Sequence, residues 1–265
     1  MIRQPPLEIR PADAASPAVM LHPFLPERLG TRCGVLILPG GGYGHLSTEK
    51  EGTAVGEWLA SHGIVSAMLE YRLAPARHPA PLDDARLALR TLRVLSPEWG
   101  VDPGRVGVLG FSAGGHLAAT LCTHFDRGSP ASPDPRLRES CRPDFAILLY
   151  PVITLHPPHH HGGSRGNLLG PSPDPALLDE LSAERRVTPQ TPPAFLFHTG
   201  EDKTVPPENS VLYWQALRAA GVPAELHIFT PGGHGCGLAQ AHPSLSAWPD
   251  LAVRWLRGLG FLEPS

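Results

Sequence analysis

The sequence predicts an α/β fold in which a mostly parallel sheet is covered by helices on both faces. Short apolar runs rich in β-branched residues alternate with longer segments whose apolar residues recur at helical spacing. Such alternation is typical of parallel sheets, because each parallel connection needs a crossover that is usually a helix. Apolar residues make up 42% of the 265 residues, which is enough for the core of one large domain. We therefore expect a single domain over residues 1–265, with no linker that divides it.

Strands are expected where continuous apolar runs are bounded by Gly, Pro or polar residues, since strands of a parallel sheet are buried on both faces. Residues 1–32 are a proline-rich N-terminal extension, and its extended pieces at 7–10 and 18–21 are expected to be edge strands. The remaining strands are expected at 34–38, 64–69, 106–109, 145–150, 194–198 and 224–229.

Helices are expected between these strands, and Thr48 with Glu51 matches a capping box ahead of the first. The expected helices cover 54–62, 82–95, the run that follows Ser112, 208–220 and 245–259. The proline-rich segment 126–143 is expected to be a loop. Residues 155–193 are expected to form a loop or cap insertion with one short helix near 176–184.

Charge and hydropathy exclude several classes of partner. A formal net charge of −3, a pI near 6.5 and the lack of a basic patch argue against nucleic acid. No apolar run reaches transmembrane length, so no membrane partner is expected. The N-terminus lacks the charged start and apolar core of a signal peptide, which predicts a cytoplasmic protein. A chain from which a signal peptide had been removed would look the same, and the composition leaves the oligomeric state open.

Cysteines and histidines show no metal-binding pattern. The four cysteines have no CxxC spacing, so reduced thiols are expected, with pairing of Cys122 and Cys141 as an open alternative. Consecutive histidines rarely share one coordination geometry, and the run His156–His161 is therefore interpreted as a solvated loop. We expect neither a metal nor a cofactor.

A candidate nucleophile lies where an expected strand turns into a helix. Gly110-Phe-Ser112-Ala-Gly114 is a G-x-S-x-G sequence in that position, which is the setting of a nucleophile elbow. A strand that reverses sharply into a helix crowds the backbone around the serine, so residues without Cβ are needed on either side. The alternative is a glycine-rich turn with an incidental serine.

Two further residues complete a candidate catalytic triad with Ser112. Serine needs an adjacent base to act as a nucleophile, and His234 lies in a glycine-flanked loop after the last expected strand. Asp202 follows another strand and could orient the imidazole, although the neighbouring Glu201 is an alternative acid. The carboxyl ends of parallel strands lie along one edge, so these distant residues can meet. His116 is interpreted as a packed residue of the helix after the elbow.

Charge on a tetrahedral intermediate must be met by fixed hydrogen-bond donors. The elbow geometry offers the backbone N–H of Ala113. A second donor is expected from Gly40-Gly41-Gly42, which follows a central strand and lets the backbone approach a ligand closely.

Several motifs together resemble those of α/β-hydrolase-fold esterases. They are Pro39-Gly-Gly-Gly-Tyr43, Tyr71-Arg-Leu-Ala-Pro75, Gly110-Phe-Ser-Ala-Gly-Gly-His-Leu-Ala118 and Gly232-Gly-His234-Gly. Within that fold, the chain is most similar to acetylesterases and to acetyl-xylan and feruloyl-type esterases, over about residues 33–260. The resemblance implies Gly41, Gly42 and Ala113 as oxyanion donors. Hormone-sensitive-lipase-like esterases have His where this chain has Pro39, so the assignment between Gly41 and Gly42 stays open.

The interpretation that follows is a serine ester hydrolase for short acyl groups, with acetyl esters of sugars or xylo-oligosaccharides as its expected substrates. Tyr43, Arg165 and Asn167 are candidate substrate-binding residues, with a structural role in their loops as the alternative for the last two. Two other readings remain. One is an amide-directed hydrolase of the formamidase or peptidase kind, and the other is a non-catalytic α/β-hydrolase that serves as a binding module.

Overall fold

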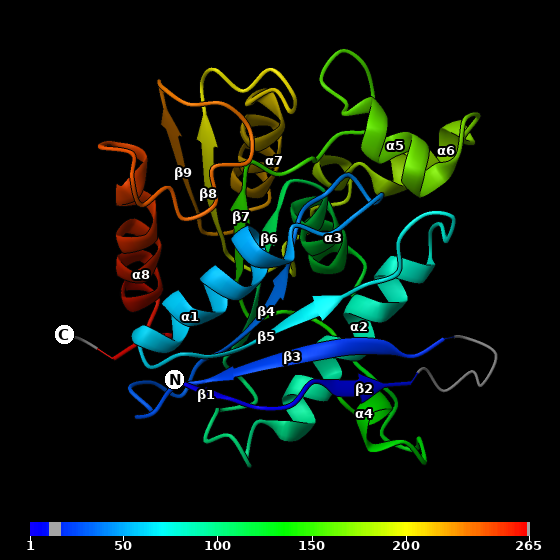
Figure 1. Ribbon diagram of the computed structural model, residues 1–265. Coiled ribbons are helices and arrows are strands. Elements are labelled where there is room, and N and C mark those ends of the chain that lie inside the picture. Colours follow the sequence, from blue (N-terminus) through cyan, green and yellow to red (C-terminus); the bar gives the residue numbers. More distant parts are fainter. Residues whose placement is uncertain (11–16, 264–265) are drawn as a thin grey trace.

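The computed structural model describes residues 1–10 and 17–263, and its core is one sheet flanked by helices (Figure 1). Along the chain the strands are β1 (Ile2–Arg3), β2 (Leu7–Ile9), β3 (Val19–Leu25), β4 (Gly34–Leu38), β5 (Val65–Glu70), β6 (Val106–Phe111), β7 (Ala146–Leu149), β8 (Ala194–Thr199) and β9 (Ala224–Phe229). Their order across the sheet is β1-β3-β5-β4-β6-β7-β8-β9, and β2 also pairs with β3. The predicted α/β-hydrolase fold is therefore confirmed.

The sheet is parallel from β5 to β9 and antiparallel at its N-terminal side. The central pair β4 and β6 places Leu36 opposite Val108, and both side chains are buried. The piece predicted as an edge strand at 18–21 instead extends to Leu25 and pairs on both sides, with β1 and β2 on one side and β5 on the other. The carboxyl ends of the parallel strands share one edge, and the loops after β4, β8 and β9 leave from it.

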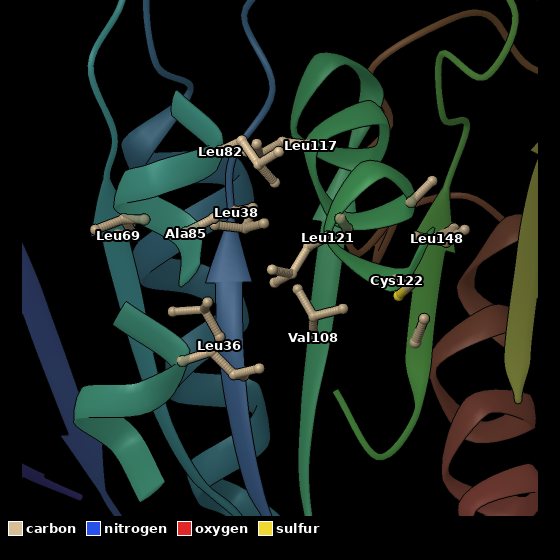
Figure 2. Close-up of a cluster of buried hydrophobic side chains, with 14 of the residues drawn as sticks. Leu36, Leu38, Leu69, Leu82, Ala85, Val108, Leu117, Leu121, Cys122 and Leu148 are labelled. Atoms are coloured by element: carbon tan, nitrogen blue, oxygen red, sulfur yellow. The ribbon is translucent and has the colours of Figure 1, made fainter. Parts of the chain in front are cut away.

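Two groups of helices cover the two faces (Figure 1). On one face lie α1 (Ala54–Ser61) and α8 (Trp248–Gly258), and on the other lie α2 (Ala80–Leu95), α3 (Ser112–Thr123) and α7 (Glu208–Ala219). Figure 2 shows Leu82 of α2 with Leu117 and Leu121 of α3 on the face of the sheet that carries Leu36, Leu38 and Val108. Full burial of a leucine side chain stabilises the fold by about 1.5–3 kcal/mol, so this layer holds α3 firmly in place.

Two segments contain more helix than predicted. Segment 126–143 contains the single turn α4 (Pro135–Arg138), and the insertion 155–193 contains α5 (Gly162–Leu169), α6 (Pro175–Leu181) and the 3₁₀ turn η2 (Ala183–Arg185). Only α6 matches the predicted short helix. The glycine-rich α5 was not predicted because glycine disfavours helix, and it lies beyond the carboxyl ends of the strands (Figure 1).

The predicted capping box at Thr48 is wrong. Its side chain forms no cap hydrogen bond, and the chain enters α1 through a π-helix, η1 (Glu49–Thr53). Glu51 points into the protein and is 4% exposed. At the C-terminal side, a short 3₁₀ turn, η3 (Leu245–Ala247), precedes α8 within the region predicted as one helix.

All four cysteines are free, so the alternative of a bridge between Cys122 and Cys141 is excluded. Burial raises the pKa of the Cys122 and Cys33 thiols well above the ordinary value. In residues 1–10 and 17–263, no helix combines the length and the apolar character that a membrane crossing requires.

Candidate active site

Ser112 occupies a strained position at the junction of β6 and α3. Its φ is +51°, in the left-handed region that costs a residue with a side chain about 1–3 kcal/mol. The neighbouring glycines make this turn possible: a Cβ at Gly114 would lie 2.1 Å from the carbonyl oxygen of Leu38, and one at Gly110 would lie 2.4 Å from that of Gly114. Strain and close packing at one serine indicate a function beyond a connecting turn.

His234 and Asp202 meet Ser112 in one hydrogen-bonded chain. The Oγ atom of Ser112 lies 2.7 Å from Nε2 of His234, and Nδ1 of His234 lies 2.6 Å from Oδ2 of Asp202. The residues come from α3, from the loop after β9 and from the loop after β8, which all leave the same edge of the sheet. The structure thus brings together the three residues that the sequence singled out.

The Asp202 carboxylate is buried but well supplied with donors. Its Oδ1 accepts the backbone N–H groups of Thr204 and Val205, both at 2.9 Å, and Nε2 of His198 lies 3.4 Å from Oδ2. Burial alone would raise the pKa of Asp202, yet hydrogen bonds from His198, His234 and Val205 outweigh it and hold the pKa well below the ordinary value. Asp202 is therefore an anion at neutral pH.

Glu201, the alternative acid, points elsewhere. Its Oε2 accepts the Gly232 N–H at 3.1 Å, and the residue is exposed. It has no hydrogen bond to His234 in the part of the chain that the structure describes.

The glycine loop (residues 39–42) follows β4 and lies beside Ser112. The N–H of Gly40 donates to Oε2 of Glu51 at 2.8 Å, so this amide is occupied. Gly41 and Gly42 have φ values of +132° and +65°, and their N–H groups have no hydrogen-bond partner among the described residues. The Ala113 N–H belongs to the first turn of α3, where backbone donors lack intrahelical partners. Three backbone donors are thus available near Ser112.

The segment Tyr71–Pro75 is hydrogen-bonded to the glycine loop and to Tyr43, the residue after it. The Tyr71 hydroxyl donates to the Pro39 carbonyl at 2.6 Å, and the Ala74 N–H donates to the Tyr43 carbonyl at 2.9 Å. Arg72 forms an ion pair with the buried Asp84 of α2 at 2.7 Å. These contacts explain the Tyr-Arg-Leu-Ala-Pro motif as a support for the loop.

A pocket of about 460 Å³ opens over Ser112 and His234. Its wall comes from the glycine loop and η1, from α5, and from the loops after β8 and β9. Of the three predicted substrate-binding residues, Asn167 of α5 lines this pocket, and its Nδ2 donates to the Gly42 carbonyl at 2.8 Å. Asn167 therefore also holds the glycine loop.

The other two predicted substrate-binding residues do not line it. The Tyr43 side chain is 1% exposed, and its hydroxyl lies 2.8 Å from Nδ1 of His116. Tyr43 therefore cannot offer an aromatic face to a substrate, because it packs in the core. Nη1 of Arg165 lies 3.5 Å from the Leu155 carbonyl oxygen, so this side chain supports its own loop. His116 is packed as predicted, and burial lowers its pKa to about 4.

His161 and Glu51 line the pocket and were not predicted to do so. His161 caps α5: its Nδ1 accepts the Ser164 N–H at 3.2 Å, which puts the proton of the neutral ring on Nε2. Burial and the proximity of His234 lower the pKa of His161. Other histidines of the run face elsewhere, His156 toward Asp179 and His159 toward Glu208. Among the residues that the structure describes, no cluster of three or more His, Cys, Asp or Glu side chains could hold a metal ion.

Comparison with known proteins places the chain in a family. The BD-FAE family model matches residues 24–217. An acetylxylan esterase from Xylanibacter ruminicola is 36% identical over 81% of this chain and 43% of its own length. An endo-1,4-beta-xylanase B from Butyrivibrio fibrisolvens is 35% identical over 78% of this chain and 33% of its own. The chain thus spans less than half the length of these two curated relatives.

A solved structure matches more completely. The acetyl ester-xyloside bifunctional hydrolase from Caldicellulosiruptor lactoaceticus superimposes with a TM-score of 0.90 and is 46% identical, over 94% of this chain and 92% of that one. The sheet, the elbow and the motifs that predicted an esterase-like fold agree with these matches. The chain therefore belongs to the BD-FAE family and has the α/β-hydrolase fold of the esterases that it resembles.

Proposed function

We propose that this protein is a serine carboxylic ester hydrolase that removes short acyl groups, in particular acetyl groups from sugars. The observation that carries the proposal is the continuous chain from Asp202 through His234 to Ser112, which opens on a pocket flanked by free backbone donors. The names of the acetylxylan esterase relative and of the acetyl ester-xyloside hydrolase support the same chemistry.

In the proposed mechanism, Ser112 Oγ attacks the acyl carbonyl carbon while His234 Nε2 takes its proton. Asp202 keeps the proton of the imidazole on Nδ1, which leaves Nε2 free to accept, and stabilises the imidazolium that forms. The developing oxyanion is met by the N–H groups of Ala113 and of Gly41 or Gly42. His234 then protonates the leaving alcohol. In the second half of the reaction, water attacks the acyl-enzyme while His234 takes its proton, and His234 returns that proton to Ser112 Oγ as the acid leaves.

The pocket wall favours a small acyl group and a polar alcohol. None of the described residues that line it is Leu, Ile, Val or Phe; most are Gly, His or other polar residues. A buried methylene contributes about 0.8 kcal/mol only where an apolar wall receives it.

Glycoside cleavage is the second candidate, because the matched structure is named a bifunctional xyloside hydrolase. Glycosidases ordinarily use two carboxyl groups on either side of the scissile bond. Glu51 is the one carboxyl residue among the described residues that line the pocket, and both of its oxygens accept hydrogen bonds from the protein. This arrangement favours ester cleavage.

Initial rates across a series of p-nitrophenyl esters test the acyl preference. We expect kcat/KM to be highest from acetyl to butyryl and to fall steeply by octanoyl, and we expect acetate release from acetylated xylo-oligosaccharides. A preference that rises with chain length would contradict the small-acyl proposal. Rapid cleavage of N-formyl amides with slow ester cleavage would favour the amide-directed alternative.

His161 is expected to distinguish sugar esters from aryl esters. Its Nε2–H has no partner among the described residues and can donate to a sugar hydroxyl. His161→Ala should lower kcat/KM for an acetylated xylo-oligosaccharide about 10-fold more than for p-nitrophenyl acetate, since a hydrogen bond of this kind contributes about 0.5–1.5 kcal/mol. His159→Ala, in the same run but outside the pocket wall, is the control. Equal losses on both substrates in His161→Ala would contradict this role.

A further inference from the structure

The two halves of the proposed site come from strands that are far apart in the sheet. The glycine loop follows β4, and the histidine loop (residues 230–238) follows β9, with β6, β7 and β8 between them. Four strand spacings correspond to about 19 Å, so the backbone hydrogen bonds of the sheet do not fix the position of one loop relative to the other. Their relative position must be fixed by contacts above the sheet edge.

The π-helix η1 supplies these contacts through two consecutive residues. Nζ of Lys50 donates to the carbonyl of Gly235, the neighbour of His234. The Glu51 carboxylate accepts the Gly40 N–H at Oε2 and the Tyr150 hydroxyl at Oε1, both at 2.8 Å. We infer that Lys50 and Glu51 are positioning residues, which together with Tyr150 clamp the histidine loop to the glycine loop.

The proton positions in this network are fixed by its backbone donor. The Gly237 N–H can only donate, and it bonds to the Tyr150 oxygen at 2.9 Å. The Tyr150 proton is then free to point to Glu51, whose two oxygens both act as acceptors, as an ionised carboxylate requires. Burial raises the pKa of Glu51, while the bonds from Tyr150 and Gly40 and the charges of His234 and Lys50 oppose that rise. The Glu51 carboxylate thus holds the glycine loop directly and the histidine loop through Tyr150.

Close packing also holds η1 against the sheet and against the histidine loop. A Cβ on Gly52 would lie 2.0 Å from the sulfur of Met68, so η1 is pressed against β5. A Cβ on Gly237, where φ is +57°, would lie 2.9 Å from Cγ of Lys50, so the lysine stem runs along the histidine loop. The Tyr150 ring meets the His234 ring edge-on, with centroids 5.0 Å apart. π-helical turns are frequent at functional sites, and η1 carries the two side chains that hold these loops.

The clamp rests on the proposed esterase reaction, and its effect is expected in kcat rather than in KM. Glu51→Gln and Tyr150→Phe should each lower kcat for p-nitrophenyl acetate about 10-fold or more, with KM within about 3-fold, because a lost bond to a charged group misplaces both loops. The double variant should be little worse than the poorer single one, since both act through one network. Lys50→Arg, which keeps a donor, should retain more activity than Lys50→Met.

Rates are taken per active site, titrated with a serine-directed organophosphate, and Tm is measured for each variant. Glu49→Gln is the matched control, because Glu49 is an exposed carboxylate on the same π-helix. Unchanged kcat per site in Glu51→Gln, or fully additive losses in the double variant, would overturn the clamp while wild-type turnover still supported the esterase. Peptide-resolved hydrogen exchange tests the clamp without turnover. Glu51→Gln should speed exchange in both loops, and protection that is unchanged in either loop would also overturn it.

Discussion

Replacing Ser112 by Ala is expected to lower kcat for p-nitrophenyl acetate on the order of 10⁴-fold or more, as removal of a triad nucleophile does. The Ser112 hydroxyl is the group that His234 contacts, at 2.7 Å, and it lies at the strained turn between β6 and α3. Without it no acyl-enzyme can form. Initial rates with p-nitrophenyl acetate measure the loss, and mass spectrometry should find an acyl-enzyme in the wild type but not in the variant.

A serine-directed organophosphate provides the control for this result. The native protein should be labelled once, on Ser112, and Ser112→Ala should not be labelled. Cys236 is the nearest thiol in sequence to His234, but burial raises its pKa to about 12, so little thiolate is available to compete. Label on another residue, or an alanine variant of full activity, would contradict Ser112 as the nucleophile.

Asp202→Asn is expected to be almost as severe, with a loss of about 10⁴ in rate. The reason lies in the two backbone amides at Oδ1. The N–H groups of Thr204 and Val205 can only donate, so the asparagine oxygen must take the place of Oδ1. The amide nitrogen then faces Nδ1 of His234 and donates to it. The imidazole is held with its proton on Nε2, where it cannot accept the proton of Ser112.

Glu201→Gln is the matched control for this change. Glu201 is adjacent in sequence, is exposed and accepts one backbone N–H from Gly232, which a glutamine oxygen can also accept. Its kcat should stay within about 3-fold of the wild type, as is usual for a surface substitution. Severe loss in Glu201→Gln with a mild effect in Asp202→Asn would assign the orienting acid to Glu201.

The sequence predicted the parts of the site that depend on local patterns. A serine between a strand and a helix, an acid after one strand and a histidine after another each follow from element type and chain order. Parallel topology then brings the three to one edge, and the structure shows them within hydrogen-bonding distance. These positions could be predicted because each residue is placed by its own turn and by the direction of the strand before it.

Glu51, Tyr43 and α5 could not be predicted in this way. Glu51 resembles a capping residue in sequence, but its partners are Gly40 and Tyr150, which are 11 and 99 residues away. The aromatic ring of Tyr43 suggests a sugar platform, whereas its depth in the core depends on His116 and Tyr71. Helix α5 forms despite its glycines because His161 caps it and Asn167 ties it to the glycine loop. Such environments arise only from tertiary contacts.

The bond between Asn167 and the Gly42 carbonyl limits how this scaffold can be re-engineered. Segment 155–193 contributes His161, Gly163 and Asn167 to the pocket wall, which makes it a natural place to exchange loops between relatives. In this protein the same segment holds the backbone beside the nucleophile, at 2.8 Å from Asn167 to Gly42. A grafted segment that lacks an amide donor at this position would alter rate along with selectivity. A change in this segment therefore also affects the backbone beside Ser112, and loop libraries should keep Asn167 fixed.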